Sequence, residues 1–158
     1  MSERPVFHAD HVSWTVADAD AVAKFYMDVF GATELFRMGP MDAADMPNGA
    51  DGRDWMASHV NVAGAKLSLI MLRLTETLNL QLAQYDKPQD RRTDLPRNCD
   101  AGGHHLGLRV NDVTAAVTYL TANGCTAMDP IEISEGPLAG KTNVYLQDPW
   151  GHQLEIVD

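Results

Sequence analysis

The strongest constraint on the fold of this chain is an internal repeat. Residues 11–18 read HVSWTVAD and residues 105–112 read HLGLRVND, so a histidine, an apolar run and an aspartate recur at a constant offset of 94 residues. Beyond this stretch, Ala21 matches Ala115 at the same offset. A repeat of this length indicates two copies of one supersecondary unit.

Each copy is predicted to begin with a strand that leads into a helix. Short apolar runs predict strands, an aspartate favours the first position of a helix, and a glycine favours its end. The predicted strands are residues 12–16 and 106–110, and the predicted helices run from Asp18 to Gly31 and from Asp112 to Gly124.

Further extended segments follow each helix. They are residues 33–37, 56–62, 66–74 and 78–85 in the first copy, and residues 126–133, 143–147 and 153–157 in the second. The sequence therefore predicts an α+β fold made of two βαβββ modules, residues 8–88 and 104–158, with a linker at 89–103. At 158 residues and 45% hydrophobic content, we expect the two modules to form a single domain, residues 1–158.

The segment at residues 38–54 is rich in Gly, Asp, Pro and Met and lacks periodicity. It is predicted to be either a mobile loop over a site or a solvated insertion.

Composition excludes several classes of partner. Twelve basic and 22 acidic residues give a net charge of −10, which repels nucleic acid and anionic membrane surfaces. The two cysteines, Cys99 and Cys125, show no paired spacing that would indicate a disulfide framework or a thiolate metal site. No apolar run has the length of a signal peptide core or a membrane span. We therefore expect a cytoplasmic protein.

The repeat places two histidines in equivalent positions. His11 matches His105, and each precedes a small residue by two positions, Ser13 in the first copy and Gly107 in the second. Because side chains alternate along a strand, each histidine shares a face with its small neighbour, which leaves room in front of the imidazole. Two histidines at matching positions of a repeat favour a metal site over two separate structural roles.

At this point the chain resembles the vicinal oxygen chelate superfamily, which includes glyoxalase I, methylmalonyl-CoA epimerase, extradiol dioxygenases and bleomycin resistance proteins. The resemblance rests on His11, His105 and the terminal stretch DPWGHQLEIVD, which contains Glu155. It implies that the sheets of two βαβββ modules curl into a cup, with metal ligands on the first and last strands of each module.

The resemblance also implies a fourth ligand on the last strand of the first module. Two stretches could be that strand: KLSLIML would place Ser68 at the ligand position, and LNLQLAQYDKP would place Gln81 there. We prefer Gln81, because Tyr85 and Pro88 follow it as they do in many relatives. The expected metal ligands are then His11, Gln81, His105 and Glu155.

Two imidazoles, one carboxylate and one amide oxygen suit one divalent ion of Fe, Co, Ni, Zn or Mn. The resemblance implies a lyase or isomerase of the glyoxalase I or methylmalonyl-CoA epimerase type. Its substrate would be a small molecule with adjacent oxygens, and it would stabilise a metal-chelated enediolate during proton transfer. Glu155 is the expected base as well as a ligand, and Ser13 and Arg109 are expected to contact the substrate from the ligand face. A homodimer is also implied.

Two other functions remain open. An Fe(II)-dependent extradiol dioxygenase needs only the two histidines and Glu155, and Tyr145 lies at a spacing similar to that of a catalytic dioxygenase tyrosine. A non-catalytic drug-binding protein is the third possibility, although such relatives usually lack the metal ligands.

Overall fold

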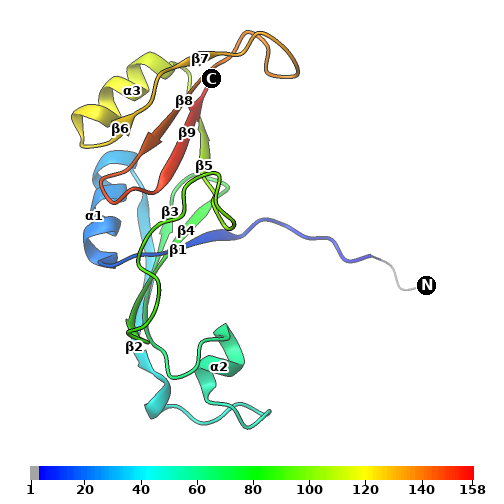
Figure 1. The fold of residues 1–158 in the computed structure, drawn as a ribbon, viewed down its shortest axis with the longest axis vertical. Coiled ribbons are helices and arrows are strands. Elements are labelled where there is room, and N and C mark those ends of the chain that lie inside the picture. Colours follow the sequence, from blue (N-terminus) through cyan, green and yellow to red (C-terminus); the bar gives the residue numbers. More distant parts are fainter. Residues whose placement is uncertain (1–3) are drawn as a thin grey trace. The chain divides into compact units, whose positions relative to one another are not determined.

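The computed structural model describes residues 4–158, which form two compact units, unit 1 ending at Thr93 and unit 2 beginning at Asp94. The boundary falls inside the predicted linker 89–103. Both units contain a strand, a helix and further strands in the predicted order (Figure 1). The α+β class is therefore confirmed, while the single domain with modules 8–88 and 104–158 stays a prediction.

Unit 1 contains a four-stranded sheet with the order β1-β4-β3-β2. The first and last strands of the unit, β1 and β4, pair in parallel, and the other neighbours pair antiparallel. The elements are β1 (His11–Thr15), α1 (Ala19–Phe30), β2 (Thr33–Asp42), a 3-10 turn η1 (Ala43–Asp45), α2 (Trp55–Val60), β3 (Lys66–Arg73) and β4 (Asn79–Lys87).

Unit 2 repeats this topology with the order β5-β9-β8-β6, and the short strand β7 also pairs with β8. Here too the first and last strands, β5 and β9, are parallel. The elements are β5 (Leu106–Arg109), α3 (Val113–Ala122), β6 (Thr126–Ala127), β7 (Ile131–Glu132), β8 (Thr142–Gln147) and β9 (Gln153–Val157).

The first helix of each unit begins at its predicted cap. The carboxylate of Asp18 accepts a hydrogen bond from the backbone N–H of Ala21 at 2.9 Å, and Asp112 accepts one from Ala115 at the same distance. Each bond satisfies a backbone donor that the helix itself leaves unpaired. Helix α1 ends at Gly31 with φ 70°, a left-handed conformation that favours glycine.

Each sheet packs one apolar face against its helix. In unit 1, Trp14 and Tyr26 meet edge to face with ring centroids 5.6 Å apart, and Leu80 and Leu82 are fully buried. Each such side chain contributes about 1.5–3 kcal/mol when buried. The corresponding buried residues of the sheet in unit 2 are Leu106, Val144, Leu146, Leu154 and Ile156. The alternate residues of the strands lie on the opposite face, and the candidate functional residues are among them.

One predicted strand is wrong. Residues 56–62 were predicted to be extended, but α2 (Trp55–Val60) occupies most of this segment. The carboxylate of Asp54 caps this helix by accepting from the backbone N–H of Ala57 at 2.9 Å, and Met56 is fully buried. Capping and burial therefore outweigh the weak alternation of apolar residues at the end of the segment.

Two other predicted strands differ in extent. The strand predicted at 33–37 continues to Asp42 through an irregular stretch around Gly39, so the segment 38–54 begins as strand. The strand predicted at 126–133 is split into β6 and β7, with Pro130 between them. Proline has no backbone N–H to donate to a neighbouring strand, which favours such a break.

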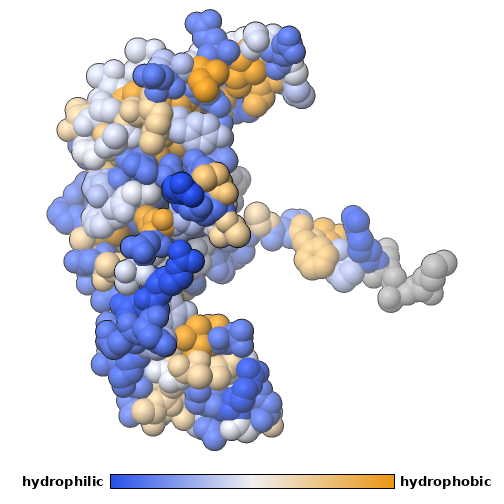
Figure 2. All heavy atoms as spheres, in the orientation of Figure 1, coloured by the Kyte–Doolittle hydropathy of each residue, from blue (hydrophilic) through white to orange (hydrophobic). Residues whose placement is uncertain are grey.

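Hydrophilic residues dominate the surface seen in Figure 2, as the net charge of −10 leads one to expect. Within residues 4–158, no helix is both long enough and apolar enough to cross a membrane.

Candidate functional site

In unit 1, side chains of the first and last strands lie next to one another on the face of the sheet opposite α1. Ser13 on β1 lies opposite Gln81 on β4, and its hydroxyl donates a hydrogen bond to Gln81 Oε1 at 3.0 Å. His11 lies two residues before Ser13 and therefore on the same face. The predicted residues His11, Ser13 and Gln81 thus share one exposed face of unit 1.

Asp10 orients the imidazole of His11. The distance from His11 Nδ1 to Asp10 Oδ1 is 2.6 Å, so Nδ1 donates to the carboxylate. The other ring nitrogen, Nε2, keeps its lone pair for a ligand. A carboxylate behind an imidazole in this way is a common support for a metal-binding histidine.

Unit 2 contains an equivalent pair. Gly107 on β5 lies opposite Glu155 on β9, and His105 precedes Gly107 by two residues, as His11 precedes Ser13. The distance from His105 Nε2 to Glu155 Oε2 is 3.2 Å, and both side chains are partly accessible. A histidine and an oxygen donor therefore lie on the same pair of strands in both units.

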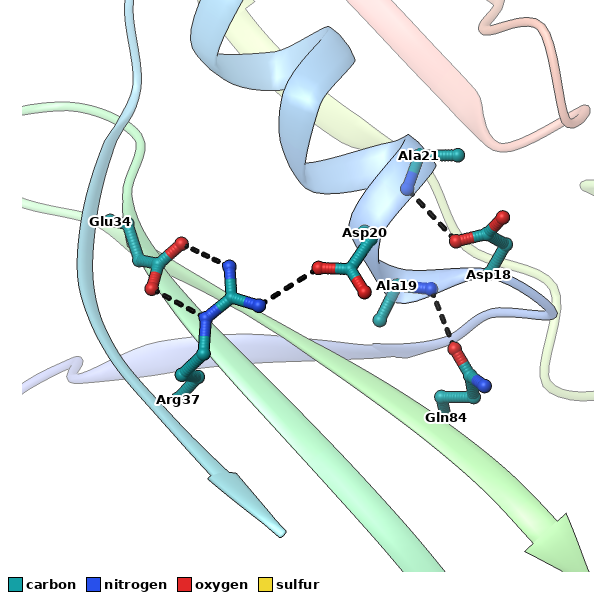
Figure 3. Close-up of polar contacts among 7 residues, drawn as sticks. All are labelled: Asp18, Ala19, Asp20, Ala21, Glu34, Arg37 and Gln84. Carbon is teal, nitrogen blue, oxygen red and sulfur yellow. Dashed lines mark hydrogen bonds and ion pairs between the residues drawn. The ribbon is translucent and has the colours of Figure 1, made fainter. Parts of the chain in front are cut away.

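This equivalence identifies Gln81 as the counterpart of Glu155. Both residues lie on the last strand of their unit, opposite the small residue that follows the histidine by two positions. The alternative, Ser68, lies on β3 opposite Gln84. Gln84 belongs to the helix side of the sheet, because its Oε1 accepts from the backbone N–H of Ala19 at the start of α1 at 2.9 Å (Figure 3).

Two further side chains surround Glu155. Asn143 on β8 donates from Nδ2 to Glu155 Oε1 at 2.7 Å, which leaves Oε2 as the oxygen that faces His105. The Tyr145 ring meets the His105 ring edge to face, with centroids 5.2 Å apart. Burial raises the pKa of Tyr145, and the charge of Glu155 and a hydrogen bond to it raise this pKa further. The Tyr145 phenol therefore keeps its proton at neutral pH and can serve as a donor but not as a base.

The expected substrate-binding residues have different surroundings. The Ser13 hydroxyl already donates a hydrogen bond to Gln81. Arg109 is exposed and lies two residues beyond Gly107 on the same face, and its side chain makes no hydrogen bond or ion pair within residues 4–158. Among the predicted site residues, the structure thus brings Ser13 into contact with Gln81, and His105 into contact with Tyr145 and Glu155. In the described chain, the Arg109 side chain forms no hydrogen bond or ion pair with any of them.

In the described part of the chain, no three side chains from His, Cys, Asp and Glu are grouped closely enough to hold a metal ion. The candidate ligands occur as two pairs, one in each unit: His11 with Gln81, and His105 with Glu155.

Sequence analysis missed two residues of this arrangement, Asp10 and Asn143. The sequence position of each residue nevertheless indicated that it lies near the site. Asp10 directly precedes the repeated histidine, and Asn143 lies two residues before Tyr145, so strand alternation places it on the face that carries Glu155.

The fold and the site together point to one class of proteins. Its features here are two βαβββ units, each with a pair of candidate metal ligands on its first and last strands. The family model of the Glyoxalase/Bleomycin resistance protein/Dioxygenase superfamily matches residues 8–156. The chain therefore belongs to this superfamily, as its resemblance to the vicinal oxygen chelate proteins implied.

Individual relatives agree with this assignment. A 2-epi-5-epi-valiolone epimerase from Actinomyces sp. is 44% identical over 151 residues, which cover 94% of this chain and 77% of the relative. Two solved structures share the fold. They are a glyoxalase family protein from Bacillus cereus (TM-score 0.73, 14% identity, 99% of this chain and 97% of that chain) and one from Enterococcus faecalis (TM-score 0.59, 17% identity, 98% of each chain).

The relationship to the epimerase bears on the predicted functions. At 44% identity over nearly the whole chain, it supports an enzyme of the isomerase class, which sequence analysis placed ahead of the dioxygenase and the drug-binding protein. The chain is accordingly an enzyme.

Proposed function

We propose that the chain is a metal-dependent epimerase that inverts a carbon atom next to the carbonyl group of a small hydroxyketone. The observation that carries this proposal is the pair of His105 and Glu155, 3.2 Å apart on the polar face of unit 2, with the Tyr145 phenol beside them. The epimerase relative supports the reaction class, and its name gives 2-epi-5-epi-valiolone, a ketone by its ending, as that protein's substrate. We infer a substrate of the same kind here, with a second oxygen adjacent to the carbonyl.

The proposed metal ligands are His11, Gln81, His105 and Glu155, and they suit one divalent ion of the series Fe, Co, Ni, Zn and Mn. Their surroundings support this role, because Asp10 contacts Nδ1 of His11 and not Nε2, and Asn143 donates to Oε1 of Glu155 and not to Oε2, the oxygen that faces His105. When bound, such an ion polarises a carbonyl oxygen and stabilises negative charge on it.

Two side chains of unit 2, Glu155 and Tyr145, are the proposed proton acceptor and proton donor of the reaction. Glu155 is proposed to alternate between the role of a ligand and that of the base, in which Oε2 removes the proton from the carbon next to the carbonyl. Tyr145 is the proposed proton donor, since its raised pKa keeps the phenol protonated. Tyr145 gives its proton to the opposite face of the same carbon, and the proton taken up by Glu155 then passes to Tyr145 through the hydrogen bond between them. Both side chains regain their starting state, so the reaction is redox-neutral and needs no co-substrate.

A homodimer and a cytoplasmic location are part of the proposal. Both cysteines are free, which suits a reducing compartment. Analytical ultracentrifugation of the purified chain at several concentrations tests the dimer.

The first test combines metal analysis with proton exchange. The chain, purified without chelator, is expected to contain one divalent ion per chain. It should also catalyse exchange of the proton next to the carbonyl of 2-epi-5-epi-valiolone in deuterated water, followed by NMR. Glu155→Gln should slow exchange by about 100-fold or more, the usual contribution of a general base. His105→Ala should lose the metal.

His104→Ala is the matched control. His104 is adjacent in sequence, but its Nδ1 contacts the Gly102 carbonyl oxygen at 3.1 Å in the loop before β5. This variant should keep both metal and exchange. Equal metal content in His104→Ala and His105→Ala would refute the proposed ligand set, and absence of exchange by the metal-loaded native chain would refute the epimerase.

A further inference from the structure

Arg73, at the end of β3, lies on the same face of unit 1 as the proposed metal ligands. It pairs across the sheet with Asn79 on β4, and Asn79 pairs with His11 on β1. Directly paired residues share a face, so these three residues form one row across the sheet. The adjacent row contains Ser13 and Gln81. With about 4.8 Å between neighbouring strands, the Cα atoms of Arg73 and His11 are about 10 Å apart.

Arg73 has no partner within residues 4–158, in contrast to Arg37 on the neighbouring strand β2. The Arg37 guanidinium donates to both carboxylate oxygens of Glu34, at 2.8 and 2.6 Å, and to Asp20 at 2.9 Å (Figure 3). Arg73 is exposed, and its side chain makes no hydrogen bond or ion pair in this part of the chain. A guanidinium with all five N–H donors available therefore lies beside the candidate site.

The fold does not require a cation at this position. In unit 2, Gln147 on β8 pairs with Gln153 on β9, and continuing the register of β5 by one residue places His105 beside Gln153. Gln147 therefore holds the position that corresponds to Arg73. The same topology therefore accommodates a neutral side chain at this position.

We infer that Arg73 determines substrate specificity by binding an oxyanion group of the substrate, a phosphate ester or a carboxylate. This inference rests on the proposed function and narrows its substrate class to small hydroxyketones that carry such a group. A chain with a net charge of −10 repels anions at long range, so an anionic substrate needs a dedicated cation at the site. A guanidinium suits this task because its planar fork can donate two parallel hydrogen bonds to one phosphate or carboxylate.

The test compares charged and uncharged substrates. The probes are 2-epi-5-epi-valiolone, its phosphate monoester and the corresponding carboxylic acid, each assayed by proton exchange with the metal-loaded chain. We expect the native chain to prefer one of the charged probes through a lower KM. Arg73→Gln should reduce that preference by about 10- to 100-fold, the loss expected for a charge-assisted contact. Arg73→Lys should restore part of it.

Arg92→Gln is the matched control, because Arg92 is an exposed arginine of the linker segment that also lacks a partner within residues 4–158. It removes the same charge away from the sheet and should keep the native preference. An equal effect of Arg73→Gln and Arg92→Gln would overturn the inference, as would a native preference for the uncharged ketone.

A separate measurement distinguishes failure of this inference from failure of the proposed function. Inorganic phosphate and acetate are titrated calorimetrically into the native chain and into Arg73→Gln. Binding that is lost in Arg73→Gln supports the anion site even if no ketone is turned over. Equal binding by both chains, or no binding by either, contradicts it.

Discussion

Asp10 and Asn143 act in the same manner in the two units. Asp10 occupies Nδ1 of His11, and Asn143 occupies Oε1 of Glu155, so each candidate ligand is held by one atom and presents the other. Such neighbours fix the orientation of a ligand and raise its affinity for a metal. In the proposed epimerase, these two residues would set the geometry of the site without contacting the substrate.

Asn143→Ala separates this positioning role from a structural one. The variant removes the donor to Glu155, and we expect metal affinity to fall by about 10- to 100-fold. Stability should change little, because the substitution also removes Asn143 Oδ1, a buried oxygen without a hydrogen-bond partner in the described chain. Metal titration and thermal unfolding of the metal-free protein measure the two effects. Asn98→Ala, in the exposed linker, is the control, and a large loss of stability with unchanged metal affinity would contradict the prediction.

The two cysteines should differ in reactivity. Burial raises the pKa of Cys125 from about 9 to about 11, and the charge of Asp148 adds to this effect, whereas Cys99 is exposed. The thiolate is the reactive form. Alkylation at pH 8 should therefore modify Cys99 in the native chain and Cys125 only after unfolding, as followed by mass spectrometry. Equal rates at both thiols in the folded protein would show that Cys125 is accessible.

The pKa of Cys125 also gives a pH dependence. The folded-state pKa lies above that of the unfolded chain, so the neutral thiol stabilises the fold fully below about pH 9. This contribution is lost as the pH rises from 9 through 11. Urea unfolding measures the free energy of unfolding of the native chain and of Cys125→Ala between pH 9 and 11. This free energy should fall less steeply with pH in the variant.

At the scale of elements, local patterns predicted most of the secondary structure. Alternation and apolar runs predicted the strands, and aspartates predicted the starts of α1 and α3. Helix α2 was missed for a physical reason. It has only six residues, so its own propensity gives a weak signal, and its stability depends on the Asp54 cap and on the burial of Met56, which follows from tertiary packing.

The dependence of α2 on its cap is measurable. Asp54 accepts from the backbone N–H of Ala57 at 2.9 Å and from that of Gly64 at 3.3 Å. Asp54→Ala should lower the free energy of unfolding by about 1 kcal/mol, the usual cost of a lost N-cap, as determined in urea. Asp45→Ala, at an exposed aspartate without a partner in the described chain, should have little effect. Similar losses in both variants would contradict a specific contribution of the Asp54 cap.

At the scale of the whole molecule, the repeat was the most informative feature of the sequence. It placed His11 and His105 in equivalent positions and thereby predicted which face of each first strand carries the candidate ligands. It could not decide between Gln81 and Ser68, because both of their segments have strand patterns and only the pairing of β4 with β1 distinguishes them. The roles of Asn143 and Arg73 depend likewise on register between strands far apart in sequence, which a local pattern does not contain.

The parallel pairing of first and last strands also has a consequence for folding. Ser13 and Gln81 are 68 residues apart in sequence, so their contact closes a long loop and carries a large entropic cost. We expect such contacts to form late, after the local hairpin of β3 and β4. A growing or partly unfolded chain therefore lacks the histidine–oxygen pairs, and any ligand that needs them binds only to a finished unit. Ligand binding would therefore report that the unit has finished folding.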